Sequence, residues 1–120
     1  MKTKMLKKNY EFRRVFENKK YYGGKYLEVF ILKNRLNENF LGIAISKKIA
    51  NSVNRNKIKR LIRESYRRLE NNISLGYNMV ILWKKNVDIK HANYNNVYND
   101  LENILLNAKI YIRDEIWKKY

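Results

Sequence analysis

The chain has 120 residues and carries 27 Lys and Arg against 11 Asp and Glu, a formal net charge of +16. This length fits one domain, residues 1–120, with a single modest core. The absence of cysteine excludes disulfides and thiolate nucleophiles, and no apolar run approaches the roughly 20 residues of a membrane span.

So large a like charge favours a polyanionic partner, with nucleic acid ahead of an anionic membrane surface. The basic N-terminus is followed by no apolar signal-peptide segment, so we expect the protein to stay in the cytoplasm.

The first half of the sequence predicts one helix and two strands. In residues 6–17, the apolar residues of FRRVF recur three and four apart, as on one face of a helix. Gly23 and Gly24 end this pattern, and residues 25–33, KYLEVFILK, have the composition of a strand. A polar turn leads to a second strand over residues 40–48, FLGIAISKK. We expect these two strands to form an antiparallel hairpin.

The second half predicts helix, strand and helix. A basic helix runs to about Leu69, and either Asn51 or Ser52 can cap its start. Residues 77–83, YNMVILW, form a nearly continuous apolar run that is typical of an interior strand, and apolar spacing predicts a last helix over residues 93–114. The expected fold is therefore α+β, a small and mostly antiparallel sheet packed with helices. The expected order is α-β-β-β-α-β-α, which has one strand between the first two helices in addition to the two at residues 25–33 and 40–48.

The basic helix has two separate faces when it is projected at about 100° per residue. The apolar arc contains Leu61, Ser65, Ile58, Leu69, Ile62 and Tyr66. The cationic arc contains Arg55, Lys59, Ser52, Arg63, Asn56, Arg67 and Arg60. Like charges four residues apart destabilise a helix, so this row favours a nucleic-acid interface over an ordinary solvated face. Composition alone does not separate DNA from RNA.

The same segment carries a family motif. SVNRNKIKRLIRE, preceded by GIAISKKIAN, resembles the bacterial ribonuclease P protein component family, whose pattern is Ser-Lys-Lys, a turn, and a helix beginning Ala-Val-x-Arg-Asn-x-x-Lys-Arg-x-x-Arg. The matching residues are Ser46, Lys47, Lys48, Ser52, Val53, Arg55, Asn56, Lys59, Arg60 and Arg63. The resemblance extends over about residues 6–83. Where the family has Gly before the helix this chain has Ala50, which would be strained if the backbone there needs positive φ.

The resemblance implies a fold similar to the second domain of ribosomal protein S5, with a left-handed strand-helix-strand crossover. It implies a protein that binds a catalytic RNA and helps it remove the 5′ leader from precursor tRNA. The chemistry would belong to that RNA and its Mg²⁺ ions. The protein itself would supply no catalytic residue, and we expect no obligate protein partner for it. The residues expected to contact the catalytic RNA are Lys47, Lys48, Ser52, Arg55, Asn56, Lys59, Arg60, Arg63 and Arg67.

Three aromatic residues fall where the family has a cleft between its first helix and the sheet, which holds the single-stranded leader. They are Phe12, Phe16 and Phe30. Exposed rings can stack on unpaired bases without demanding a sequence. Judged by spacing alone, however, rings at Phe12 and Phe16 are more typical of a core.

Two other classes of function stay open from the residues alone. One is a stand-alone basic ribonuclease of the toxin type, and the other is a ribosomal or DNA-binding protein with no enzyme attached. The single histidine, His91, has no carboxylate or second histidine at catalytic or metal-binding spacing. We therefore expect no metal site in the protein itself.

Overall fold

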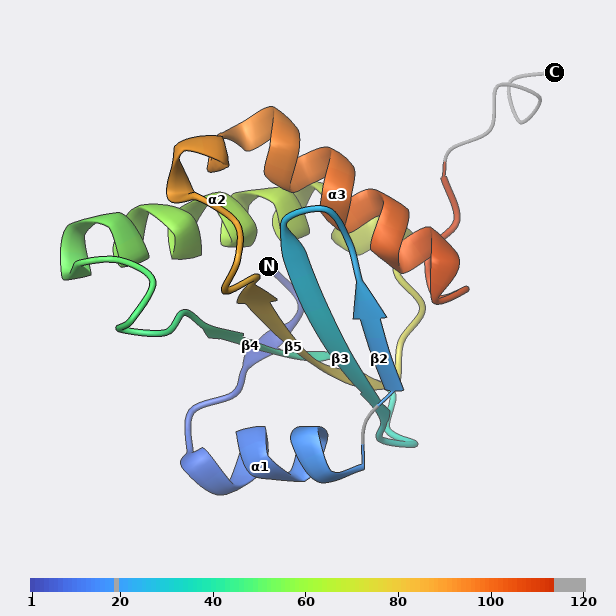
Figure 1. The fold of residues 1–120 in the computed structure, drawn as a ribbon. Coiled ribbons are helices and arrows are strands. Elements are labelled where there is room, and N and C mark those ends of the chain that lie inside the picture. The colour runs from blue at the N-terminus through green and yellow to red at the C-terminus, as the bar shows by residue number, and fades with distance from the viewer. Residues whose placement is uncertain (19, 114–120) are drawn as a thin grey trace, which may run out of the picture.

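The computed structural model describes residues 1–18 and 20–113 of the chain. In this part of the chain, a five-stranded sheet separates two helical layers (Figure 1). Helices α2 (Ser52–Leu69) and α3 (Tyr94–Asn107) cover one face, and α1 (Asn9–Glu17) lies across the other. Short 3-10 turns follow α2 at Glu70–Asn72 and precede α3 at Ile89–His91. The α+β class is confirmed, and so is the predicted order of helices and strands from α1 onward; the short strand β1 before α1 was not predicted.

The sheet is mixed. Its strands are β1 (Lys4–Met5), β2 (Lys20–Gly23), β3 (Leu27–Lys33), β4 (Phe40–Ala44) and β5 (Tyr77–Trp83). They lie in the order β1-β4-β5-β3-β2. The β1–β4 and β4–β5 pairs are parallel, whereas the β5–β3 and β3–β2 pairs are antiparallel. β4, α2 and β5 therefore form a strand-helix-strand unit of adjacent parallel strands.

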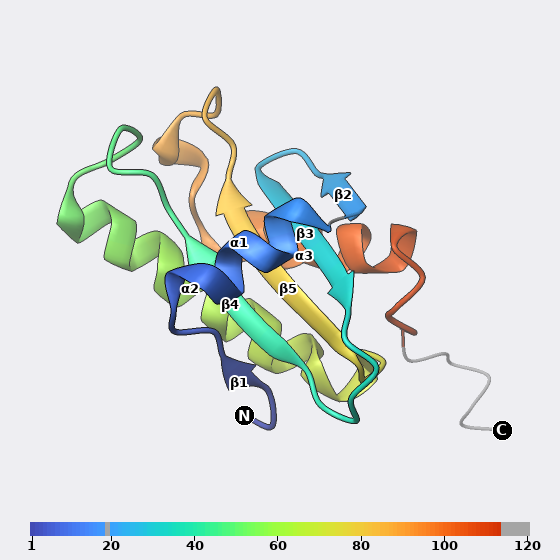
Figure 2. The same cartoon turned by 90° about the horizontal axis from the view of Figure 1, so that it is seen from below.

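The predicted hairpin between residues 25–33 and 40–48 is wrong. β3 and β4 do run in opposite directions, but β5 lies between them and pairs with both (Figure 2). The cause is the apolar character of β5 on both faces. Met79 and Ile81 are fully buried towards α2 and α3, and Val80 is fully buried towards α1. Such a strand is most stable in the middle of a sheet covered on both sides.

Two apolar clusters fill the layers. The larger joins the sheet to α2 and α3 and includes Leu27, Val29 and Ile31, which lie on one face of β3. The smaller lies under α1 around Val15 and Val80. The ring of Tyr26, just before β3, stacks on Trp83 in the larger cluster, with centroids 5.9 Å apart.

The predicted start of the first helix, at residue 6, is three residues too early. The backbone N–H of Leu6 donates to the carbonyl of Leu41 at 2.8 Å, which continues the β1–β4 pairing and keeps the chain extended. The helix begins only after the N–H groups of Lys7 and Lys8 donate to the Glu11 carboxylate, at 3.1 and 2.8 Å. Sheet pairing thus overrides the helical spacing before Asn9.

The predicted last helix is too long. α3 ends at Asn107, and Lys109 has a left-handed φ of 61° that turns the chain back. Tyr111 then forms an isolated bridge with Ile73, so Ile112 is exposed outside the helix. Asp114, the predicted end, lies outside the described residues.

Candidate nucleic-acid interface

The predicted faces of the basic helix are confirmed in α2. Asn51 caps it, since its Oδ1 accepts from the N–H of Asn54 at 2.9 Å. The residues that α2 buries against the sheet and α3 are Ile58, Ile62, Ser65, Tyr66 and Leu69. Leu61 packs partly buried beside them. Apolar packing on one side therefore fixes which side chains of α2 face solvent.

The turn before α2 presents two further cations. β4 ends at Ala44, earlier than predicted, and Lys47 and Lys48 are exposed in the turn that follows. Ser46 holds this turn, because its Oγ accepts from the N–H of Lys48 and its carbonyl from the N–H of Ile49, each at 3.1 Å. Both lysines are thereby presented beside the N-terminal end of α2.

Ala50 carries no backbone strain at the position where the family has glycine. Among the non-glycine residues of the described chain, only Arg35 and Lys109 have positive φ. The carbonyl of Ala50 accepts from Nη1 of Arg55 at 2.9 Å. This hydrogen bond ties the first arginine of the helix to the turn that precedes it.

The other expected RNA-binding residues are free to meet a ligand. Lys59 is partly buried and the rest are exposed: Lys47, Lys48, Ser52, Asn56, Arg60, Arg63 and Arg67. In the described residues the ion pairs are Lys4–Glu38 and Arg113–Glu102, each 3.0 Å, and neither involves α2. The cations of α2 are therefore not neutralised by any carboxylate of residues 1–18 and 20–113.

The three phenylalanines lie together between α1 and the sheet, and all are partly buried. Phe16 meets Phe30 nearly edge-on, with centroids 5.1 Å apart. The ring of Phe12 packs on Gly42, where an added Cβ would come within 2.6 Å of it. Phe12 thus fills the space above a residue with no side chain, whereas Phe16 and Phe30 form a pair of rings beside it.

Sequence reasoning missed the residues that extend this aromatic pair. The exposed ring of Tyr21 lies 5.2 Å from that of Phe30, its neighbour in the β2–β3 register. Its hydroxyl donates to Glu28 at 2.6 Å, and this bond and partial burial raise the pKa of Tyr21. Tyr21 also lines an open hollow of about 450 Å³ with Lys84 and Lys85. Recognising residues 20–23 as a strand would have revealed Tyr21.

Isolated polar residues have structural roles. The carboxylate of buried Asp100 accepts from the backbone N–H groups of Lys25, Tyr26 and Leu27 at 2.7 to 2.9 Å. Over residues 1–18 and 20–113, no group of three or more His, Cys, Asp or Glu could hold a metal ion. No helix in the same ranges has the length and apolarity needed to cross a membrane.

The fold and this surface define a class: a small, strongly cationic α+β protein with one exposed helix face whose cations form no ion pair within the described residues. Comparison with known proteins is more specific. The family model described as Ribonuclease P matches residues 1–109. The ribonuclease P protein component of Clostridium botulinum (strain 657 / Type Ba4) is 42% identical over 112 residues, which cover 92% of this chain and 99% of that protein.

Solved structures of RNase P proteins also match the chain. The Staphylococcus aureus RNase P protein matches with a TM-score of 0.80 and 30% identity, covering 92% of this chain and 100% of that one. A mutant of the S. aureus RNase P protein with defective mRNA degradation activity matches with a TM-score of 0.79 and 30% identity, covering 89% of each chain. The chain belongs to the bacterial ribonuclease P protein component family. Membership implies association with the ribonuclease P RNA and a part in tRNA processing.

Proposed function

We propose that the exposed face of α2 and the turn before it bind the catalytic RNA of ribonuclease P. The observation that carries this proposal is the row of cations on α2, which has no carboxylate partner in the part of the chain that the structure describes, although the helix packs firmly on the sheet. Lys and Arg side chains neutralise phosphates and release counterions, which gives affinity with little sequence information. The residues assigned to this surface are Lys47, Lys48, Ser52, Arg55, Asn56, Lys59, Arg60, Arg63 and Arg67.

The 5′ leader of precursor tRNA would lie in the cleft between α1 and the sheet. Phe16 and Phe30 would offer ring faces or edges to unpaired bases, and Phe12 would form the packed floor beside them. The adjoining hollow with Tyr21, Lys84 and Lys85 supports this assignment, because it adds a further ring and two cations for phosphates.

Cleavage of the phosphodiester bond would belong to the RNA and to the Mg²⁺ ions bound mainly by it. The protein's own residues would hold the catalytic RNA and the leader in the cytoplasm, where the tRNA is made. Their effect would be tighter binding of precursor than of mature tRNA and a lower Mg²⁺ requirement, since added cations replace part of the charge neutralisation.

Two measurements test the proposed partners. Isolation of the protein from its cells at moderate salt should recover one abundant structured RNA, identified by sequencing as ribonuclease P RNA. The reconstituted complex should then cleave precursor tRNA at lower Mg²⁺ than the RNA alone. Equal affinity for precursor and mature tRNA would contradict the role in leader recognition.

The leader cleft has its own test. Phe16→Ala and Phe30→Ala should weaken binding of long-leader precursor tRNA by at least about fivefold, and leave binding of leaderless tRNA unchanged. Tyr94→Ala, which alters an aromatic pair on α3, is the matched control. Equal losses with and without a leader would refute the cleft assignment.

A second candidate function is ribonuclease activity of the protein itself. It is favoured by the S. aureus relative, whose mutant has defective mRNA degradation activity. Highly purified, RNA-free protein incubated with an mRNA should then produce fragments that do not depend on the ribonuclease P RNA. Intact mRNA in that assay would dismiss this second activity.

A further inference from the structure

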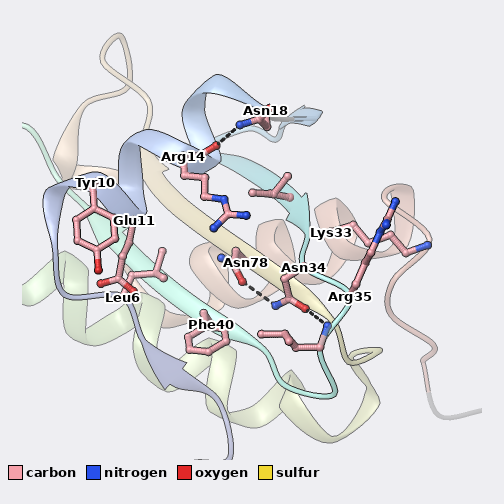
Figure 3. A pocket seen from close by; sticks show the side chains of 12 residues that line it. Leu6, Tyr10, Glu11, Arg14, Asn18, Lys33, Asn34, Arg35, Phe40 and Asn78 are labelled. Carbon is pink, nitrogen blue, oxygen red and sulfur yellow. Dashed lines mark hydrogen bonds between the residues drawn. The ribbon is translucent and has the colours of Figure 1, made fainter.

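A second hollow of about 690 Å³ lies beside α1 (Figure 3). It shares no lining residue with the hollow at Tyr21, Lys84 and Lys85. Tyr10 and Arg14 lie four residues apart and line it from one side of α1. The sheet and the loop after β3 form its other walls. Its volume falls in the range of small-ligand sites, roughly 300–1,000 Å³.

The rim of this hollow attracts anions. Arg14, Lys33 and Arg35 line it, all are exposed, and none forms an ion pair within the described chain. Figure 3 shows the Arg14 guanidinium directed over the hollow, with Lys33 and Arg35 at one edge of it, where their side chains extend outward. The lining includes one carboxylate, that of Glu11, which accepts the N–H groups of Lys7 and Lys8. These bonds lower the pKa of Glu11 and engage it in capping α1.

The floor carries an amide with unused donors. Asn34 donates to Oδ1 of Asn78 at 2.7 Å and to the carbonyl of Glu38 at 3.1 Å, and its own Oδ1 accepts from the N–H of Leu36 at 2.7 Å. Asn78 is thus held in place through its oxygen. Its Nδ2 group, in the partly buried floor, makes no hydrogen bond to the described residues and can donate to a ligand.

Two aromatic rings complete the lining. Tyr10 is 63% exposed and lines the hollow from α1, and Phe40 lines it from β4. Flat rings beside cations and a free amide are the combination that holds a base, its phosphate and its hydrogen-bonding edge.

We propose that this hollow binds one unpaired nucleotide of an RNA strand. The base would stack on Tyr10 or Phe40, the phosphate would lie between Arg14 and Arg35, and Asn78 would donate to a base carbonyl. This inference rests on the proposed RNA-binding function but assigns a site apart from the α2 face and from the Phe16–Phe30 cleft. An acidic peptide would use the cations but would leave the rings and the Asn78 amide without a role.

The test is a titration of ¹⁵N-labelled protein with the hexanucleotide U₆, followed by NMR. The side-chain amides of Asn34 and Asn78 should shift on addition of RNA. Tyr10→Ala and Arg14→Glu, both at exposed positions, should weaken that binding by at least about fivefold. Lys90→Glu makes the same charge change at an exposed residue outside the hollow and is the matched control.

Three outcomes would refute the site. In the first, the side-chain amide signal of Asn78 does not shift when U₆ is added. In the second, Arg14→Glu and Lys90→Glu weaken U₆ binding equally, and in the third, a glutamate hexapeptide shifts the Asn78 amide as much as U₆ does. Binding of ribonuclease P RNA, measured separately with Arg60→Ala/Arg63→Ala, distinguishes the two proposals. If that RNA binds through α2 while Asn78 does not respond, only the hollow is refuted. If it does not bind at all, the proposed function fails.

Discussion

Helices α2 and α3 lie against each other on the same face of the sheet, but their polar residues differ in charge (Figure 1). α2 carries one acidic residue, Glu64, and seven basic ones: Arg55, Lys57, Lys59, Arg60, Arg63, Arg67 and Arg68. α3 carries no basic residue and two acidic ones, Asp100 and Glu102. The apolar stripes are alike because both helices seat on one core, so the polar residues are what distinguishes their roles.

The acidic residues of α3 are used by the fold. Asp100 accepts three backbone N–H groups at the start of β3, and Glu102 accepts from the Tyr111 hydroxyl at 3.1 Å and from Arg113 at 3.0 Å. The cations of α2, apart from Arg55, have no such internal partner among the described residues. Charged side chains that are hydrogen-bonded within the fold have a structural role. Charged side chains that are left without an internal partner indicate an interface.

The comparison of α2 with α3 requires first that both helices contribute similarly to the core. Ile62 on α2 and Leu101 on α3 are both 0% exposed. Ile62→Ala and Leu101→Ala should therefore each lower the free energy of unfolding by about 2–5 kcal/mol, measured by urea denaturation. Arg63→Ala, on the exposed face, should stay within about 0.5 kcal/mol of the parent. A near-zero effect of either core substitution would show that its helix is not seated as described.

The next largest expected effect is a difference in stability between variants of two acidic residues, Asp100 on α3 and Glu64 on α2. Asp100→Ala should cost about 1–3 kcal/mol, because it leaves the buried N–H of Leu27 and the partly buried N–H groups of Lys25 and Tyr26 without a partner. Glu64→Ala on α2 should change stability by no more than about 0.5 kcal/mol, since that side chain is exposed and forms no ion pair within the described residues. Thermal unfolding of both variants measures the difference, and equal losses would contradict a structural role specific to Asp100.

The cationic face is tested by salt. Arg60→Ala combined with Arg63→Ala should weaken binding of ribonuclease P RNA and flatten the plot of log affinity against log salt. The expected decrease in slope is about 0.7–0.9 for each phosphate that the variant no longer neutralises. Filter binding at several salt concentrations measures it. A slope equal to that of the parent would mean that Arg60 and Arg63 do not face RNA phosphates.

Local sequence patterns predicted most of the helices and strands, but they did not predict which strands pair across the sheet. α2 and β5 were found because the residues that define each element lie within that element: a cap at Asn51, a helical apolar arc, and a continuous apolar run at residues 77–83. The neighbours of β3 and β4 were wrong because β5, which separates them, comes more than thirty residues later in the sequence. Strand order depends on burial of whole faces, which periodicity within one segment does not encode.

The candidate sites follow the same rule. The cationic face was predictable because one helix supplies nearly all of it. The hollow at Tyr10, Arg14 and Asn78 was not predictable, since its lining comes from α1, from β5 and from the loop that follows β3. Asn78 in particular resembles a polar interruption in an apolar strand until the structure shows Asn34 holding it.

A smaller effect concerns the end of α2 and pH. Burial raises the pKa of Glu70, but hydrogen bonds from Thr3 and from the N–H of Lys2, with the N-terminal charge, outweigh it and lower the pKa overall. A lowered pKa contributes stability above the unfolded value, which is lost as pH falls through the folded value. Glu70→Gln should thus be less stable than the parent at pH 7, and the difference should vanish at low pH.

Glu17→Gln, at an exposed residue, provides the control for that pH series. Urea denaturation at each pH gives the free energies. A difference between parent and Glu70→Gln that persists below the range in which Glu titrates would mean that Glu70 acts through packing rather than through its charge.

The smallest expected effect is the strictest test of the comparison. Asn99 and Asn103 lie four residues apart and exposed on α3, so Asn99→Lys with Asn103→Lys places on α3 a pair of cations like those of α2. If position on α2 matters, RNA affinity and its salt slope should stay nearly unchanged, and stability should change by less than about 0.5 kcal/mol. A gain in slope as large as the decrease caused by the two arginine substitutions would mean that the RNA senses only net charge. The unpaired row on α2 would then hold no special place, because any exposed helix of this protein would serve equally well.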